Sequence, residues 1–341
     1  MMKKIAILTI VSDNCGNRLQ NYALQETLRK MNCNVYTIRR RKKSVKYKIK
    51  QLVRSILLRD YHSACFWFNQ KIKWAKQVIP EKNEDFEFSD CYDKYVIGSD
   101  QIWNVTFPFI GANDFLPCVP DEKKLSYAAS FGIDEIPVEH RLNVKEWLTH
   151  ISNISVREEA GKNIVENLTG KKAEIVLDPT LLLDASEWEK IEKKPKGRLP
   201  LKYIFAYILG DNSSVKQLKK NAEKWDISVI EFDGKNGAIG PEEFVYCIHH
   251  AEAIYTDSFH ASVFSMIFRK KFQILRRVGN DNDMYSRLDT LCKTFELYDR
   301  EYDEMDVERL LNQKAQYDTQ EKILKAKRYQ SLTYLDAALN K

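Results

Sequence analysis

The sequence lacks the patterns that define several large protein classes. Its seven cysteines are odd in number and widely scattered, and none forms a Cys-x-x-Cys pair, which argues against a zinc ribbon or a disulfide scaffold. No stretch approaches the roughly 18–20 apolar residues that span a bilayer. Neither a G-x-G-x-x-G run nor a P-loop is present, and no helix-turn-helix, RNP or zinc-finger pattern indicates a nucleic-acid partner. Because unpaired cysteines are typical of a reducing compartment, we expect a cytoplasmic protein.

Strands and helices alternate along the chain, which has 341 residues and therefore room for two domains. In the first half the apolar spacing predicts strands at 4–11, 35–38, 95–97, 125–129, 151–156 and 175–177, and helices at 19–31, 61–77, 138–149 and 157–167. Residues 184–200 contain Pro195, Gly197 and Pro200 and form the best candidate linker. The second half predicts strands at 203–209, 228–232, 253–256 and 272–275, and helices at 213–225, 241–249, 259–268 and 321–339. The pattern predicts an α/β fold of two domains that face each other across a cleft.

The segment 253–272, AIYTDSFHASVFSMIFRKKF, carries the strongest functional signal. A buried strand runs into a helix there, with Thr256, Asp257, Ser258 and His260 at the junction. Ligands of parallel sheets bind beyond the carboxyl ends of strands, and a helix start offers free N–H groups to an anion. His260 is therefore a candidate acid or base, with a purely structural histidine as the alternative. Asp257 or Ser258 can instead simply cap the helix.

The loop after the first predicted strand is a second candidate site. It offers Asn14, Gly16, Asn17 and Gln20, and Gly16 permits a tight turn or the close approach of a ligand. The amide side chains suit sugar hydroxyls or phosphate oxygens, and turn and cap chemistry explains them equally well.

Two more strand ends carry candidate side chains. In GSDQIWN, 98–104, Asp100 and Gln101 can hold or deprotonate a hydroxyl, and Trp103 can stack on a sugar; the alternatives are a helix cap for Asp100 and a core position for Trp103. Arg157 follows another strand, and its planar fork suits a phosphate or a carboxylate. Surface pairing with Glu158 or Glu159 is its structural alternative.

Residues 39–54 form a strongly basic segment, with nine Lys or Arg and no acidic residue. Apolar residues continue at helical spacing through Leu58, so a basic amphipathic helix is predicted. Such a helix can lie on a membrane surface or pack on the protein's own core, and a solvated loop is the remaining alternative.

Taken in order, these segments resemble the polysaccharide pyruvyl transferase family. The matching motifs are NCGNRLQNYALQ (14–25), VIGSDQIWN (96–104), YAASFG (127–132), SVREEAG (155–161), LDPT (177–180), FAYILGD (205–211) and TDSFHASVFS (256–265). The resemblance covers roughly residues 4–275 and implies two Rossmann-like domains arranged as in GT-B glycosyltransferases. We assign the first to 1–185, on the acceptor side with the basic segment 39–59, and the second to 200–315, on the donor side. A helix at 316–341 can pack back across both.

The resemblance also implies the reaction and the roles of individual residues. Members transfer a pyruvyl group from phosphoenolpyruvate to two hydroxyls of a sugar in a surface or capsular polysaccharide precursor, often lipid-linked. His260 and Asp100 take the catalytic positions and Arg157 the donor-binding position. With Arg157 we place Asp257, Ser258 and Phe259 on the donor side. The acceptor side is assigned to Asn14, Gly16, Asn17, Gln20, Gln101 and Trp103. Neither a metal nor a cofactor is expected besides phosphoenolpyruvate as co-substrate.

One position departs from the family pattern. Many members read S-R-L-H before the histidine helix, whereas Ser258 stands here where their donor-binding arginine lies. Either another cation replaces it, with Lys271, Arg276, Arg277 and Arg287 the nearest in sequence, or the donor differs. A GT-B glycosyltransferase that uses a nucleotide sugar, with Asp233 or Glu242 holding the ribose, is the alternative function. A non-catalytic saccharide-binding relative is another. We further expect peripheral contact with the inner face of the membrane and a homodimer.

Overall fold

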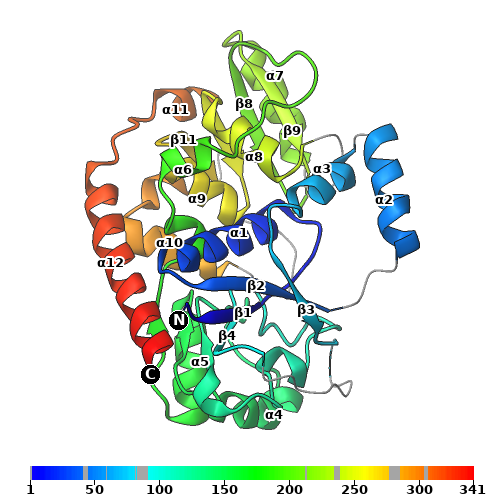
Figure 1. Ribbon diagram of the computed structural model, residues 1–341. Helices are drawn as coiled ribbons and strands as arrows, with labels where there is room; N and C mark the ends of the chain where they lie inside the picture. The colour runs from blue at the N-terminus through cyan, green and yellow to red at the C-terminus, as the bar shows by residue number, and fades with distance from the viewer. Residues whose placement is uncertain are drawn as a thin grey trace.

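The chain folds around two parallel β-sheets (Figure 1). The structure is a computed structural model that describes residues 2–40, 45–58, 60–80, 82, 91–211, 213–233, 239–275, 285–302 and 306–341. In the second sheet a helix follows each of β8, β9 and β10, and in the first sheet helices follow β1 and β2, so the alternation predicted from the sequence is confirmed for these strands.

The first sheet has the strand order β3-β2-β1-β4-β5. Its strands are β1 (Lys4–Leu8), β2 (Asn34–Arg39), β3 (Trp74–Val78), β4 (Lys94–Ile97) and β5 (Lys124–Ser126). The helices of this half are α1 (Cys15–Lys30), α2 (Val45–Leu57), α3 (Tyr61–Phe68), α4 (Val138–Thr149) and α5 (Glu159–Thr169), with short 3₁₀ turns at Ala112–Phe115 and Asp121–Lys123. A small parallel pair, β6 (Ser155–Val156) and β7 (Glu174–Ile175), continues beside β5. The central strand β1 pairs with β2 and β4 and is almost wholly buried, as its apolar residues require.

The second sheet has the order β11-β10-β8-β9. Its strands are β8 (Tyr203–Tyr207), β9 (Ser228–Phe232), β10 (Ala253–Thr256) and β11 (Lys271–Ile274). Its helices are α7 (Ser213–Glu223), α8 (Pro241–His249), α9 (Phe259–Ile267), α10 (Ser286–Phe295), α11 (Val307–Asn312) and α12 (Asp318–Asn340), with a 3₁₀ turn at Tyr298–Arg300. The 3₁₀ turn η3 (Pro179–Leu181) and helix α6 (Ala185–Glu189) connect the two halves.

One predicted helix is wrong. The spacing of apolar residues predicts a helix over 61–77, but α3 ends at Phe68 and the chain continues as the strand β3. This strand pairs with β2 at the edge of the sheet, and only Ala75 of its five residues is buried. An edge strand that buries so little shows a weak period of two, so the helical spacing before it dominated the prediction.

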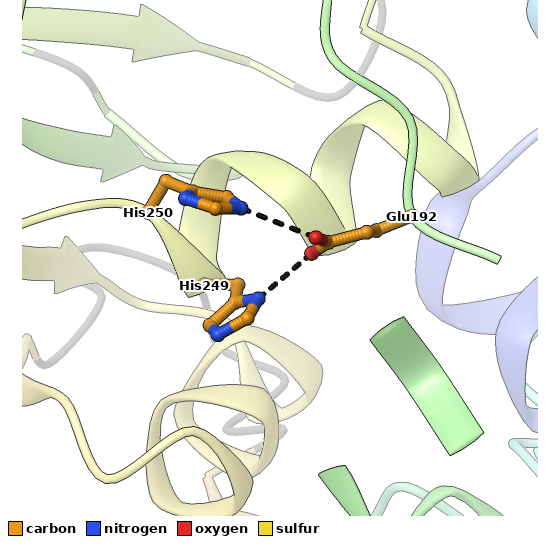
Figure 2. Close-up of side chains that lie close together, drawn as sticks. All are labelled: Glu192, His249 and His250. Carbon is orange, nitrogen blue, oxygen red and sulfur yellow. Dashed lines mark hydrogen bonds and ion pairs between the residues drawn. The ribbon is translucent and has the colours of Figure 1, made fainter. Parts of the chain in front are cut away.

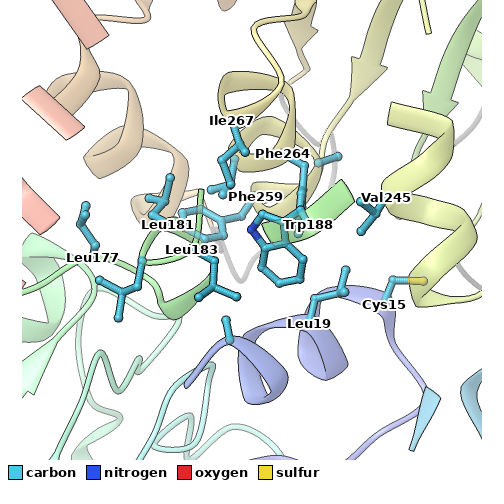
Figure 3. Packing of buried hydrophobic residues seen from close by; sticks show 14 of the residues in the cluster. Cys15, Leu19, Leu177, Leu181, Leu183, Trp188, Val245, Phe259, Phe264 and Ile267 are labelled. Atoms are coloured by element: carbon cyan, nitrogen blue, oxygen red, sulfur yellow. The ribbon is translucent and has the colours of Figure 1, made fainter. Parts of the chain in front are cut away.

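A cluster of buried hydrophobic side chains joins the two halves (Figure 3). Its centre is Trp188, which is completely buried and contacts Phe264 of α9 edge-on, with ring centroids 4.8 Å apart. Leu19 of α1 and Val245 of α8 belong to the same cluster. The two sheets therefore share one core across the face that separates them.

Helix α12 crosses from the second half back to the first, along one side of the molecule (Figure 1). Near its start, Gln320 donates to the carbonyl of Phe295. Further along, Arg328 donates to the carbonyl of Leu183 at 2.7 Å, and Tyr334 donates to that of Ser126 at 3.0 Å. The helix thus fastens the halves together. Within the described residues, no helix has both the length and the apolar content that a membrane span requires.

Candidate active site

A cleft of about 280 Å³ lies where the carboxyl ends of strands from both sheets meet. Segments that follow β1 and β4 line it from the first sheet, and segments that follow β8 and β10 line it from the second. The lining residues are Ile10, Ser12, Asn14, Asn17, Asp100, Gln101, Phe107, Phe109, Leu209, Asp257, Ser258, Phe259, His260, Tyr285, Arg287 and Leu288. Parallel α/β sheets place ligands at this end.

His260 enters the cleft from the first turn of α9 and lies against the opposite half of the molecule. Ser258 is the N-cap of α9, and its hydroxyl accepts the N–H of Ala261 at 3.4 Å. A Cβ atom at Gly16, in α1, would lie only 2.1 Å from Nδ1 of His260. Glycine at position 16 therefore makes room for the imidazole ring, and the two halves touch through this contact.

A buried network of charges surrounds His260. Asp178 accepts a hydrogen bond from Nη1 of Arg157 at 2.6 Å, and Nε2 of His260 lies 3.8 Å from the same carboxylate. Nη2 of Arg157 lies 3.6 Å from Asp100, whose other oxygen accepts from Nδ2 of Asn17 at 3.0 Å. Asp100 has φ = +65°, in the left-handed region that costs a non-glycine residue roughly 1 kcal/mol or more.

The network sets the protonation of its members. Burial lowers the pKa of His260, and the carboxylates of Asp178 and Asp100 oppose this effect only in part. Burial alone would raise the pKa of Asp100 and of Asp178, but the charge of Arg157, assisted by His260, holds both below their usual range. The site therefore holds a neutral imidazole beside two ionised carboxylates at neutral pH.

The donor-side residues predicted from the sequence separate into two groups. Asp257, Ser258 and Phe259 line the cleft, and the carboxylate of Asp257 also accepts the N–H groups of Leu209 and Gly210, each at 2.8 Å. Arg157 lies behind the ring of Phe259, with its guanidinium carbon 4.7 Å from the ring centroid, and lines a smaller adjoining cavity. Arg157 also lies 3.9 Å from Glu158, but this contact and its pairing with Asp178 are buried, unlike the surface pairing considered as the alternative.

Among the cations considered as replacements for the family arginine, Arg287 is the one that the structure brings to the site. It lies in the first turn of α10 and lines both the main cleft and the adjoining cavity. Lys271 donates to the carbonyl of Leu311 and lines neither. Arg276 and Arg277 lie outside the described residues.

The acceptor-side prediction needs three corrections. Asn14, Asn17 and Gln101 line the cleft, but Gly16, Gln20 and Trp103 do not. Gly16 instead lies against the ring of His260. Gln20 is fully buried and donates to Thr9 at 3.0 Å. Trp103 is also fully buried and stacks on Phe115 with ring centroids 5.4 Å apart, so it takes the core position that was its alternative.

Several contributors to the site, including Asp178, Phe107 and Phe109, were not among the predicted residues. Asp178 follows β7 in the motif LDPT, and this strand-end position is the signal by which it could have been found. Phe107 and Phe109 stack with ring centroids 5.4 Å apart and line the cleft, although no periodic pattern marks their loop. They offer the apolar ring surface expected of Trp103.

A separate group of ligand-type side chains lies away from the cleft (Figure 2). Glu192 accepts from Nδ1 of His249 at 2.8 Å and pairs with Nε2 of His250 at 3.1 Å. Two histidines and a glutamate are a donor set for zinc, and no fourth His, Cys, Asp or Glu completes it in the described part of the chain. Each imidazole already has its own carboxylate oxygen, so the group ties the segment after α6 to the end of α8.

Comparison with known proteins places the chain in a family. The sequence profile described as "Polysaccharide pyruvyl transferase" matches residues 14–276, most of the chain, and no curated protein sequence matches. Among solved structures, the chain is similar to UDP-GlcNAc 2-epimerase of Methanocaldococcus jannaschii in complex with UDP-GlcNAc and UDP. The TM-score is 0.50 and the identity 13%, over 96% of this chain and 99% of that one. UGT89C1 of Arabidopsis thaliana, complexed with UDP-L-rhamnose, gives a TM-score of 0.49 and 10% identity over 99% of each chain. The fold is thus the GT-B-like pair of parallel-sheet domains, and the chain is a transferase that belongs to the polysaccharide pyruvyl transferase family.

Proposed function

We propose that the protein transfers the pyruvyl group of phosphoenolpyruvate to two hydroxyls of a sugar in a surface or capsular polysaccharide precursor, forming a cyclic ketal. One observation carries the proposal. His260 from the second sheet and Asp100 from the first meet in one cleft, and Nε2 of His260 has no hydrogen-bond partner within the described residues. A buried nitrogen without a partner is costly, so it favours a ligand that hydrogen-bonds to it.

The chemistry requires a proton to move twice. One sugar hydroxyl adds to C2 of phosphoenolpyruvate as C3 gains a proton, and the second hydroxyl then displaces phosphate from C2, losing its own proton to the released phosphate. The neutral imidazole of His260 is suited to take the proton of the first hydroxyl and to return it to C3. Asp100, ionised beside Arg157, is suited to orient that hydroxyl as a hydrogen-bond acceptor.

The donor carries a carboxylate and a phosphate, so it needs positive charge in the cleft. Arg287 supplies this charge at the cleft wall, in place of the arginine that Ser258 replaces. Arg157 lies behind Phe259 and does not line the main cleft, so its role in the proposal is to hold Asp178 and Asp100 ionised.

The acceptor enters beside Asn14, Asn17, Gln101 and the rings of Phe107 and Phe109. Amide groups bond sugar hydroxyls, and aromatic rings cover the apolar face of a sugar. We extend the proposal to an acceptor carried on a lipid, and hence to a cytoplasmic enzyme at the inner face of the membrane. Three expectations stay predictions: that phosphoenolpyruvate is the sole co-substrate, that no cofactor or metal is needed, and that the protein is a homodimer.

The test is the melting temperature with phosphoenolpyruvate, inorganic phosphate, UDP and UDP-GlcNAc in parallel, because a ligand of the native state raises it by mass action. We expect phosphoenolpyruvate to raise it well beyond inorganic phosphate. Arg287→Ala should remove most of the difference, whereas Arg141→Ala, which removes an exposed arginine of α4, should not.

A shift with UDP compounds alone would overturn the donor and favour the nucleotide-sugar alternative. Nothing in the cleft favours that alternative at present, since neither Asp233 nor Glu242 lines it. Glu242 instead pairs with Lys71 at 3.2 Å.

A further inference from the structure

Helix α2 concentrates the exposed apolar side chains of the molecule. Seventeen large hydrophobic side chains are exposed in the described part of the chain, and eight of them lie between Val45 and Leu58. Ile49 and Ile56 are each 57% exposed and Leu57 is 73% exposed. Apolar surface gathered in this way marks an interaction site, whereas singly scattered residues do not.

Four of the eight exposed residues form one stripe. Val45, Ile49, Leu52 and Ile56 recur at steps of four, three and four residues, so they share one face of the helix. On the other side, Ser55 is only 3% exposed, and the helix packs principally on α3. Figure 1 shows α2 at the right-hand edge of the molecule. The exposure of the stripe therefore argues against one of the two alternatives for this helix, that its apolar face packs on the protein's own core. Residues 41–44 and 59 of the basic segment lie outside the described residues.

The charges beside the stripe indicate which kind of partner binds to it. Lys46 and Lys50 are exposed and each follows a stripe residue by one position, which places them at its edge. The sequence of α2, VKYKIKQLVRSIL, contains no acidic residue. Pairing with a second copy of this face would bring like charges together, whereas an anionic surface would neutralise them.

We propose that α2 docks on a bilayer of anionic phospholipid, with its stripe at the boundary between headgroups and acyl chains and its lysines among the headgroups. Thirteen residues of helix are about 20 Å long, too short to span a bilayer of about 30 Å, so α2 lies in the plane of the membrane. The inference rests on the proposed function in one respect: docking brings the cleft to an acceptor that is carried on a lipid.

Vesicle co-sedimentation of the full chain tests the docking directly. We expect binding to mixed phosphatidylcholine–phosphatidylserine vesicles that weakens with salt, and at least roughly tenfold weaker binding to pure phosphatidylcholine. Ile49→Asp with Ile56→Asp should reduce binding to the mixed vesicles at least roughly tenfold, and so should Lys46→Glu with Lys50→Glu.

Helix α4 provides the matched control, because Val138 and Leu142 are 75% and 81% exposed and four residues apart. Val138→Asp with Leu142→Asp should leave vesicle binding unchanged. Absence of wild-type binding, equal binding to both kinds of vesicle, or equal loss in the α4 control would each overturn the docking. A dimer of the wild type that Ile49→Asp dissociates would overturn it in favour of a second copy.

The vesicle-binding test of α2 does not depend on whether phosphoenolpyruvate is the donor. Vesicle binding needs no phosphoenolpyruvate, and phosphate release with a soluble saccharide needs no vesicle. Failed docking with an intact melting shift would remove only the membrane inference. Docking without any effect of phosphoenolpyruvate would remove only the proposed function.

Discussion

Helices α9 and α2 are both rich in apolar residues and free of acidic ones, yet they lie at opposite extremes of exposure. Every residue of α9, Phe259–Ile267, is buried, and its single ionisable side chain, His260, points to the cleft. In α2, Val45–Leu57, the apolar stripe is in solvent and lysines flank it. The difference lies in the surroundings. Helix α9 is covered by α8 and the Trp188 cluster, whereas α2 packs principally on α3 and leaves its stripe exposed. An apolar pattern predicts that one face of a helix will be buried, and the charges that flank this face indicate whether the protein itself or another surface buries it.

The largest expected contrast between the two helices is in catalysis. His260→Gln should lower kcat by roughly 100- to 10,000-fold, because it removes the proposed general acid–base group. Phosphate release from phosphoenolpyruvate with a soluble saccharide acceptor measures it. Ile49→Asp with Ile56→Asp should leave this soluble turnover unchanged. A His260→Gln variant with wild-type kcat and melting temperature would mean that the histidine is structural.

The next contrast is in stability. Trp188→Ala should lower the free energy of unfolding by about 3–5 kcal/mol, because it empties the centre of the shared core. Ile49→Ala should change it by no more than about 0.5 kcal/mol, because the side chain already lies in solvent. Denaturant titration compares the two. A cost at Ile49 similar to that at Trp188 would show that the stripe is covered by the protein itself.

A smaller effect on stability is expected from the contact between His260 of α9 and Gly16 of α1. Gly16→Ala should destabilise the protein by about 1–3 kcal/mol through overpacking against the imidazole. Combined with His260→Ala, which removes the ring, the same change should cost little. The difference between the two costs is the coupling energy of a double-mutant cycle. Gly161→Ala, in α5, is the control, since its Cβ would lie no closer than 3.3 Å to a neighbour. Additive effects of Gly16→Ala and His260→Ala would contradict the contact.

The smallest expected effect is a shift in pH dependence. His260 must be neutral to accept a proton, and burial lowers its pKa, so activity should persist below the usual titration range of histidine. The carboxylate of Asp178 raises the pKa of His260, so Asp178→Asn should move the acid limb of kcat/KM to lower pH. A limb that stays in place or moves to higher pH would show that Asp178 does not act on His260.

The sequence predicts the fold well because most of its strands are apolar on both faces, a pattern that requires helices on each side. It predicts less well where this signal is weak. The edge strand β3 buries one residue of five and was assigned to a helix. Trp103 and Gln20 follow the right strands but turn into the core, because which way a side chain points after a strand depends on packing that one sequence does not reveal. Phe107 and Phe109 come to the site from a loop that has no periodic pattern, whereas Asp178 directly follows the predicted strand 175–177 and was not singled out.

The contact of the His260 ring with the backbone of Gly16 has a consequence for the order of events in turnover. The imidazole belongs to one half of the molecule, while Gly16, Asn17 and Asp100 belong to the other. Any movement that parts the halves to release a bulky product must also withdraw the imidazole from Asp100. When the halves are far enough apart for substrate to enter and product to leave, the site is unable to react. When the site is able to react, substrate and product cannot pass. Such a gate would protect a half-transferred pyruvyl group from water without any separate lid.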